Sequence, residues 1–125
     1  QYMIHLVAAR LYRDAAQNDQ AVEQFQGALQ LNPCMRVVID ELADYLELSG
    51  QAHRLEEEYR RVLLHLADQD HELAADLWKR LTVLYHQRLD DDDRARKALE
   101  VARYMEPEDP PVQELEMELE LFPDE

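Results

Sequence analysis

The chain has 125 residues, enough for one domain or for a short array of repeats. Hydrophobic residues make up 46% of it, aromatic residues make up 7%, and glycine occurs only twice, so helices with a core of small aliphatic side chains are favoured over sheets. The formal net charge is −15, which excludes nucleic acids and anionic membrane surfaces as partners, because phosphate binding requires a basic surface.

Cysteine content and targeting signals bear on location. Cys34 is the single cysteine, so an internal disulfide bond is impossible and a reducing compartment is compatible with the sequence. No apolar run reaches transmembrane length and no signal-peptide pattern is present, so we expect a cytoplasmic location and no membrane partner. The chain begins with Gln1 rather than Met, which is consistent with a piece of a longer protein whose targeting signals could lie elsewhere.

The first expected element is a helical hairpin. Apolar residues recur at helical spacing over Met3–Tyr12, and a polar segment that starts at Gln17 interrupts them. We expect Asp19 to cap a second helix, which stops before Pro33. One face of this second helix carries residues spaced i, i+4 and i+7, namely Ala21, Phe25 and Ala28.

A second hairpin is expected next. Its first helix covers Val37–Leu48, and Ser49-Gly50 makes the turn. The helix that follows repeats the i, i+4, i+7 spacing with Leu55, Tyr59 and Val62.

A third hairpin and a last helix complete the chain. The third pair of helices is expected over about Glu72–Leu89 and Asp92–Met105, and its repeated face consists of Ala95, Leu99 and Ala102. The last helix is expected over about residues 110–122, since proline is tolerated in a first helical turn. Its apolar pattern consists of Val112, Leu115, Leu119 and Phe122.

The spacing of these landmarks indicates a repeat. Ala21, Phe25, Ala28 and Pro33 are each followed 74 residues later by Ala95, Leu99, Ala102 and Pro107. Tyr12 and Tyr85 are 73 residues apart, which predicts one extra residue in the turn at Asp90–Asp93. The middle copy lies 34 residues after the first, so about five residues are inserted near Gln69–Leu73, as a longer connection or an extra helical turn.

These landmarks resemble the tetratricopeptide repeat, a helix-turn-helix of about 34 residues. The first copy matches at Tyr12, Ala21, Phe25, Ala28 and Pro33, and the third matches at Trp78, Leu81, Tyr85, Ala95, Ala102 and Pro107. The middle copy is degenerate: it keeps Leu42, Gly50 and Tyr59 but has Leu55, Val62 and Ala67 where two small residues and a proline are expected. The first copy departs from the pattern too, with His5 in place of the early tryptophan and Ala8 and Ala9 in place of Leu-Gly.

The resemblance implies an all-α fold, a single domain over residues 1–125. This fold would be an α-solenoid of three antiparallel hairpins in a right-handed superhelix, with repeats at about 2–35, 36–69 and 75–109 and a C-terminal capping helix at about 110–122. Because small residues let helices approach closely, Leu55 and Val62 should push the middle pair apart and alter the curvature locally, unless small neighbours absorb the volume.

The resemblance also implies a function: a non-catalytic interaction module that binds a peptide or partner helix in a groove lined by the first helix of each repeat. The groove positions most relevant to a partner are Arg10, Arg13, Asp40, Glu41, Asp44, Glu47, Lys79, Arg80, Val83 and His86. This groove would be acidic in the middle and basic at both ends, so a mixed-charge or basic segment is the favoured partner. Alternatively, its carboxylates only form a solvated face.

One partner class of the family is disfavoured. Members that clamp acidic chaperone tails use Lys, Asn and Arg, whereas the matching positions here are Leu6, Arg10, Glu41, Asp76 and Arg80. Of these, Arg80 alone matches in kind, and Glu41 and Asp76 would repel a carboxylate.

Other functions were weighed against the interaction module. The main alternative is self-assembly into a homo-oligomer through the solenoid ends, because an uncapped end exposes apolar surface. We expect no catalytic residues, cofactor or metal site: Asp90–Asp93 lack the glycine and glutamate of a calcium loop, and His65 and His71 have no third ligand.

Overall fold

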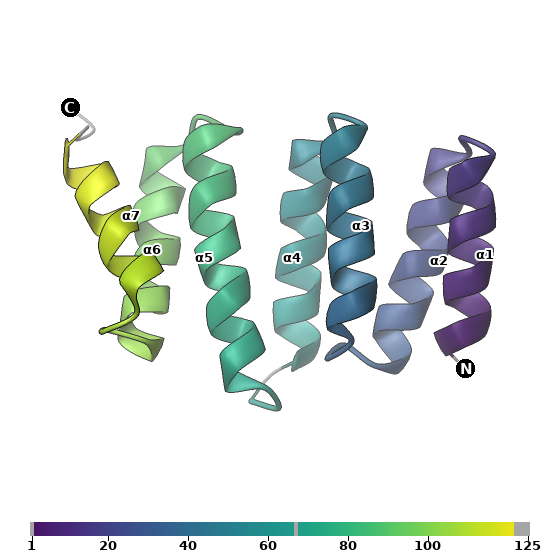
Figure 1. Cartoon of the computed structure of the whole chain (residues 1–125), viewed down its shortest axis with the longest axis horizontal. Coiled ribbons are helices and arrows are strands. Elements are labelled where there is room, and N and C mark those ends of the chain that lie inside the picture. The colour runs from purple at the N-terminus through teal and green to yellow at the C-terminus, as the bar shows by residue number, and fades with distance from the viewer. Residues whose placement is uncertain (1, 67, 122–125) are drawn as a thin grey trace. The chain divides into compact units, whose positions relative to one another are not determined.

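The computed structural model describes residues 2–66 and 68–121, and all the regular secondary structure in these ranges is helical (Figure 1). The helices are α1 (Tyr2–Asp14), α2 (Asn18–Leu31), α3 (Arg36–Leu48), α4 (Ala52–Leu66), α5 (His71–Gln87), α6 (Asp92–Met105) and α7 (Pro110–Leu121). The all-α prediction is therefore confirmed for the described part of the chain. The chain divides into two compact units, unit 1 (residues 1–69) and unit 2 (residues 70–125), and each is described by itself.

The turns within the three helix pairs share one backbone feature. Each contains one residue in the left-handed region: Ala16 with φ 58°, Gly50 with φ 71° and Asp90 with φ 52°. A left-handed residue just after a helix lets the last carbonyl groups accept hydrogen bonds from the turn. Only the second turn has glycine there, the residue that adopts this conformation without steric cost.

The hydrogen bonds that close these turns repeat as well. The Gln17 amide donates to the Tyr12 carbonyl at 2.9 Å, and 34 residues later the Gln51 amide donates to the Leu46 carbonyl at 2.8 Å. In the third turn the bond runs from the Asp91 amide to the Tyr85 carbonyl and spans one residue more. This confirms the extra residue that the spacing of the repeats predicts.

The inserted residues lie in a longer helix rather than in a longer connection. Helix α5 has 17 residues, whereas α1 and α3 have 13 each. Its N-terminus is capped by Asp70, whose Oδ1 accepts a hydrogen bond from the Leu73 amide at 3.0 Å. Of the two possibilities that the sequence left open, the extra helical turn is the one found.

The expected cap of α2 is wrong. The helix begins at Asn18 and its N-cap position is Gln17, which makes no side-chain capping bond. Asp19 thus lies inside the first turn, and its Oδ1 accepts from Arg54 Nη1 at 2.9 Å. The turn bond of the Gln17 amide brings the chain into helical conformation earlier than an Asp19 cap requires.

In unit 1, α1 and α2 lie close together along their length. Ala21, Phe25 and Ala28 of α2 are each fully buried, as their shared face predicts. By contrast, α3 and α4 approach one another closely at only a few backbone positions. Leu55 and Val62 are buried at the positions where small residues were expected, which agrees with the predicted separation of the middle pair.

In unit 2, α5 and α6 pack closely and α7 contacts both. The alanines at 95, 98 and 102 of α6 are almost wholly buried, and Val112 and Leu119 of α7 are buried as well. The apolar pattern of the last helix is thus used inside its own unit. Phe122, which belongs to the same predicted pattern, lies outside the described residues.

Candidate functional site

Arg10 of α1 and Glu41 of α3, two of the predicted groove residues, form an ion pair within unit 1. Arg10 Nε donates to both carboxylate oxygens at 3.1 Å, and Nη2 donates to Oε1 at 2.7 Å. These hydrogen bonds, together with the nearby negative charge, raise the pKa of the Arg10 guanidinium. The pair joins α1 to α3 and neutralises one positive charge expected in the groove.

An apolar row lies on the exposed side of α1. Ile4 is 70% exposed, Val7 is 49% exposed and Leu11 is 65% exposed. Their spacing of i, i+3 and i+7 places them on one side of the helix, opposite the buried Leu6 and Ala9. Exposed aliphatic side chains in a contiguous row are a more informative signal than scattered ones.

An acidic row lies on the exposed side of α3. It consists of three exposed carboxylates at spacing i, i+4 and i+7: Asp40, Asp44 and Glu47. Two exposed aliphatic residues, Val37 and Leu48, lie at its ends. The three acidic residues were all predicted from the sequence as groove positions.

The two rows share one face of unit 1. Successive helical residues are rotated by about 100°, so Val7 lies about 60° to one side of Arg10, and Asp44 lies about 60° to the other side of Glu41. Because α1 and α3 run in the same direction and Arg10 and Glu41 point toward one another, these opposite rotations turn both rows the same way. We name the six residues of the two rows the α1–α3 face: Ile4, Val7, Leu11, Asp40, Asp44 and Glu47.

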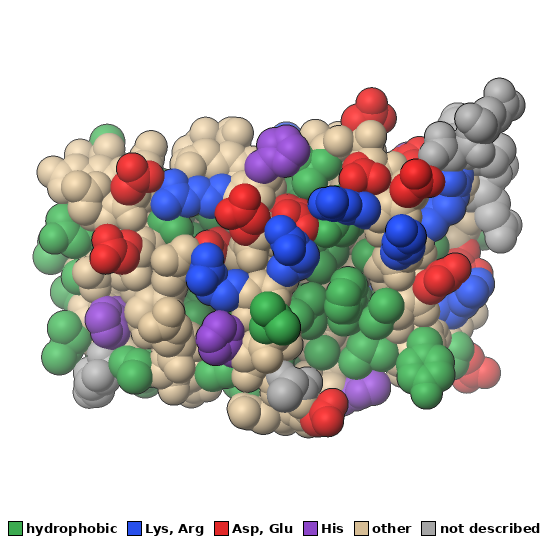
Figure 2. Space-filling view, turned by 180° about the vertical axis from the view of Figure 1, so that it is seen from behind, with side chains coloured by type: hydrophobic (Ala, Val, Ile, Leu, Met, Phe, Trp, Pro, Cys, Tyr) green, Lys and Arg blue, Asp and Glu red, His purple; other side chains and the backbone are tan. Residues whose placement is uncertain are grey.

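Figure 1 places α1 and α3 together in one layer of unit 1, with α2 and α4 behind them. The opposite side of this unit, in the left half of Figure 2, has basic and acidic side chains next to one another. Printed ion pairs there include Arg54 with Asp19 at 2.9 Å and Arg60 with Glu56 at 2.5 Å. Arg13, another predicted groove residue, lies 3.5 Å from the neighbouring Asp14. The α1–α3 face is therefore the more acidic side of unit 1.

The predicted groove lysine of unit 2 is held by carboxylates of its own unit. Lys79 Nζ donates to Glu106 Oε1 at 3.1 Å and to Asp109 Oδ2 at 3.2 Å. Partial desolvation lowers the pKa of this ammonium group, but the two hydrogen bonds and the two negative charges outweigh it, and the pKa is raised overall. Lys79 thus ties α5 to the segment between α6 and α7.

His86, also predicted, lies between two carboxylates. Its Nδ1 is 2.7 Å from Asp92 Oδ1, and its Nε2 is 3.4 Å from Glu118 Oε1 on α7. Arg80 pairs with Asp76 one turn earlier on α5, at 3.1 Å. Val83 is half-buried. The charged members of the predicted set in unit 2 therefore have partners within the unit.

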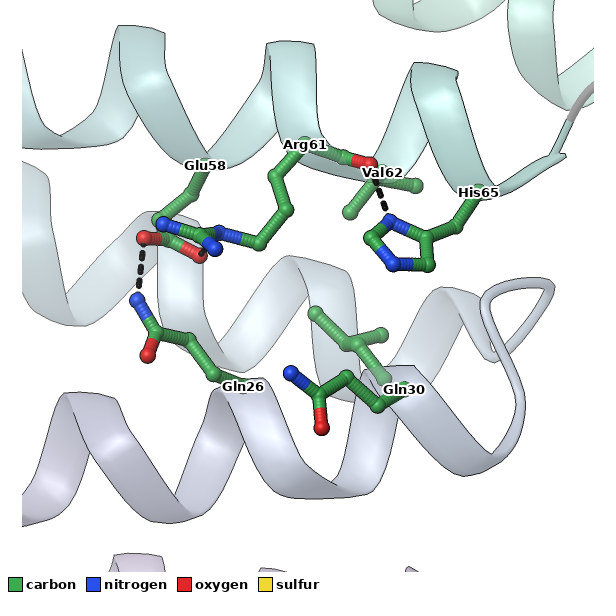
Figure 3. Close-up of a pocket in the computed structure, with 7 residues that line it drawn as sticks. Gln26, Gln30, Glu58, Arg61, Val62 and His65 are labelled. Atoms are coloured by element: carbon green, nitrogen blue, oxygen red, sulfur yellow. Dashed lines mark hydrogen bonds and ion pairs between the residues drawn. The ribbon is translucent and has the colours of Figure 1, made fainter.

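A buried carboxylate between α2 and α4 was not predicted from the sequence (Figure 3). Glu58 is 3% exposed, and its Oε2 accepts a hydrogen bond from Gln26 Nε2 at 2.6 Å. Its Oε1 has no hydrogen-bond partner. The signal that could have found it is its position three residues after Leu55 and four before Val62, in the middle of the apolar row of α4.

Two kinds of site were searched for in the described ranges. Within residues 2–66 and 68–121, no group of three or more His, Cys, Asp or Glu is arranged to hold a metal ion. In the same ranges, every helix is too short or too polar to cross a membrane.

Comparison with protein-family models, with curated proteins and with solved structures found no match for this chain.

Proposed function

We propose that the chain is a non-catalytic interaction module of the tetratricopeptide type, and that its α1–α3 face binds a basic amphipathic helix of a partner protein. The observation that carries the proposal is the apolar row of α1 beside the acidic row of α3 on one side of unit 1. A helix that carries aliphatic residues on one flank and Lys or Arg on the other complements both rows at once.

The ion pairs favour a basic partner over a mixed or acidic one. Arg10 is already bonded to Glu41, so the α1–α3 face keeps an excess of negative charge. Lys79 and Arg80, two other cations expected in the groove, are paired with carboxylates of unit 2. Neither offers an unpaired positive charge to an acidic peptide.

The repeated turns support the architectural part of the proposal. The left-handed residues Ala16, Gly50 and Asp90 occupy corresponding positions in three helix pairs, and the closing hydrogen bonds follow the same register. In the proposed architecture the three hairpins stack into a right-handed α-solenoid that ends with α7. First helices then line a continuous concave groove, of which the α1–α3 face is one part.

The test uses a synthetic helical peptide of leucine and lysine, with the two residue types on adjacent flanks, and calorimetric titration of the chain. We expect Asp44→Lys and Leu11→Ser each to weaken binding by about tenfold, since each removes a contact worth about 1–2 kcal/mol. A leucine–glutamate peptide of the same pattern should not bind.

Matched variants control for the net charge of −15, which attracts any basic peptide. Glu57→Lys makes the same charge change at an exposed position of α4, and Leu64→Ser removes an exposed aliphatic side chain there. Both should leave the affinity unchanged. Equal weakening by Asp44→Lys and Glu57→Lys would show that the attraction is non-specific and would reject the α1–α3 face.

Self-association is the second candidate, because Ile4 and Leu11 also form an exposed apolar surface suited to a second copy. Light scattering of the chain over a range of concentrations separates the two functions. A mass that rises with concentration in the wild type but not in Leu11→Ser would assign the apolar row to self-assembly.

A further inference from the structure

The carboxylate of Glu58 has a donor for only one of its two buried oxygens. Gln26 Nε2 bonds Oε2 at 2.6 Å and so fixes the orientation of the carboxylate, while Oε1 accepts no hydrogen bond. Buried polar atoms are almost always hydrogen-bonded in native proteins, because desolvation of an unbonded one is costly. Oε1 therefore marks a place where a donor is required.

Arg61 supplies charge to this carboxylate without supplying that donor. Its Nε lies 3.5 Å from Oε1, which is an ion-pair distance, and its side chain is 45% exposed. Figure 3 shows the guanidinium beside Glu58, on the open side of the carboxylate. Because so much of it is in water, Arg61 can turn outward and uncover Oε1 without leaving its own charge buried.

A slot adjoins Glu58 between α2 and α4. Buried Leu29 and Val62 contribute apolar surface to it, and Gln30 and His65 contribute polar groups (Figure 3). The empty volume is about 230 Å³ including its open mouth, but the enclosed part has room for only a water-sized group. A primary ammonium group has this size, whereas a planar guanidinium or an imidazolium is larger.

We propose that this slot receives the ε-ammonium group of a lysine side chain presented by a partner protein. The ammonium donates to Glu58 Oε1 in place of the missing bond, and the Gln30 carboxamide oxygen accepts a second bond. The lysine methylenes lie against Leu29 and Val62, and Arg61 turns toward solvent. This site belongs to the α2–α4 layer of unit 1 and does not depend on the α1–α3 face.

The experiment titrates the ¹⁵N-labelled full chain with the capped tripeptide Gly-Lys-Gly at millimolar concentrations and follows the amide resonances of Gln26 and Gln30 by NMR. We expect saturable shifts. The Nε-acetyllysine tripeptide should bind at least about tenfold more weakly, because it lacks the charge that strengthens the hydrogen bond to a carboxylate. The Gly-Arg-Gly tripeptide should also bind more weakly, because its guanidinium exceeds the enclosed space.

Variants locate the binding. Glu58→Gln should abolish the shifts, whereas Glu57→Gln, an equal charge change at the neighbouring exposed residue, should preserve them. Arg61→Gln should strengthen binding, since it removes the group that competes for Oε1. Should circular dichroism show that Glu58→Gln disturbs the fold, Arg61→Gln decides the question.

Several results would overturn the proposal. Equal affinity for lysine and acetyllysine would show that the ammonium is not what binds. Equal loss in Glu57→Gln and Glu58→Gln would show general attraction to an acidic protein. An absence of shifts would mean that water alone satisfies Oε1, and unchanged or weaker binding in Arg61→Gln would remove Arg61 as a competitor.

Discussion

The imidazole ring of His5 on α1 lies against Gly27 on α2, so closely that a Cβ added at Gly27 would be 2.8 Å from His5 Nδ1. The same ring nitrogen lies 2.9 Å from Gln24 Oε1. Gly27 is inside a helix, where glycine is normally unfavourable. Its presence is explained by the close approach of the two helices, which leaves no room for a side chain.

Gly27→Ala should therefore destabilise the chain although alanine is the better helix former. The gain in helix propensity is about 1 kcal/mol, whereas forcing a methyl group into a filled contact costs about 1–3 kcal/mol. We expect a net loss of about 1 kcal/mol in the free energy of unfolding, measured by urea denaturation. In the His5→Ala background the same substitution should be neutral or stabilising; a loss of the same size in both backgrounds would refute the steric explanation.

Phe25→Ala should cost about 3–5 kcal/mol in the same measurement, because it opens a cavity at a fully buried aromatic side chain. Leu31→Ala is the matched control, since Leu31 lies on the same helix and is 55% exposed. It should change stability by no more than about 0.5 kcal/mol. Similar losses in both variants would contradict the assignment of Phe25 to the core.

Lys79 should give a pH-dependent contribution to stability. Its pKa in the folded chain is raised above the ordinary value of 10.5, so its contribution is fully present below that value and is lost as the pH rises through the folded-state pKa. Lys79→Met should lower the free energy of unfolding at neutral pH, and its difference from the wild type should shrink above about pH 10.5. Denaturant titrations across this range measure the difference.

Lys97→Met is the control for this prediction, because Lys97 is exposed on α6. The difference between Lys97→Met and the wild type should stay small and constant over the same range. A difference for Lys79→Met that does not change with pH would argue against a stabilising charge on its ammonium.

His86→Ala should loosen α7, because His86 contacts Asp92 at the start of α6 and Glu118 on α7. A hydrogen bond contributes about 0.5–1.5 kcal/mol, so local opening of α7 should become about 3–10 times more frequent. Hydrogen exchange of the amides between Val112 and Leu119 measures this. His53→Ala, at an exposed position of α4, should leave their exchange unchanged, and unaltered exchange in His86→Ala would contradict the role of His86.

Most of the secondary structure was predictable from the sequence, since helix periodicity and helix ends are local properties. The predicted bounds of α6 agree with the structure, and the bounds of α5 differ by one or two residues. The cap of α2 was predicted wrongly because a turn hydrogen bond, from the Gln17 amide to the Tyr12 carbonyl, influences where the helix begins. A side-chain preference such as that of Asp19 cannot reveal this bond.

The candidate site was predictable only in part. The acidic row of α3 was identified because spacing along one helix places its residues on one side. The partners of the cations were not, since Lys79 and Asp109 are 30 residues apart and only the packing of α7 on α5 brings them together. Glu58 was missed because a glutamate is usually exposed, and its burial depends on the approach of α2.

By itself, the sequence determined the helical class, the repeated turns and the residues that form the core of the first pair, because apolar spacing and turn chemistry act over a few residues. The tertiary structure alone decided which charges are neutralised, which oxygen of Glu58 lacks a donor and which rows share the α1–α3 face. These properties depend on distances between side chains far apart in the chain, and the packing of one helix on another sets those distances.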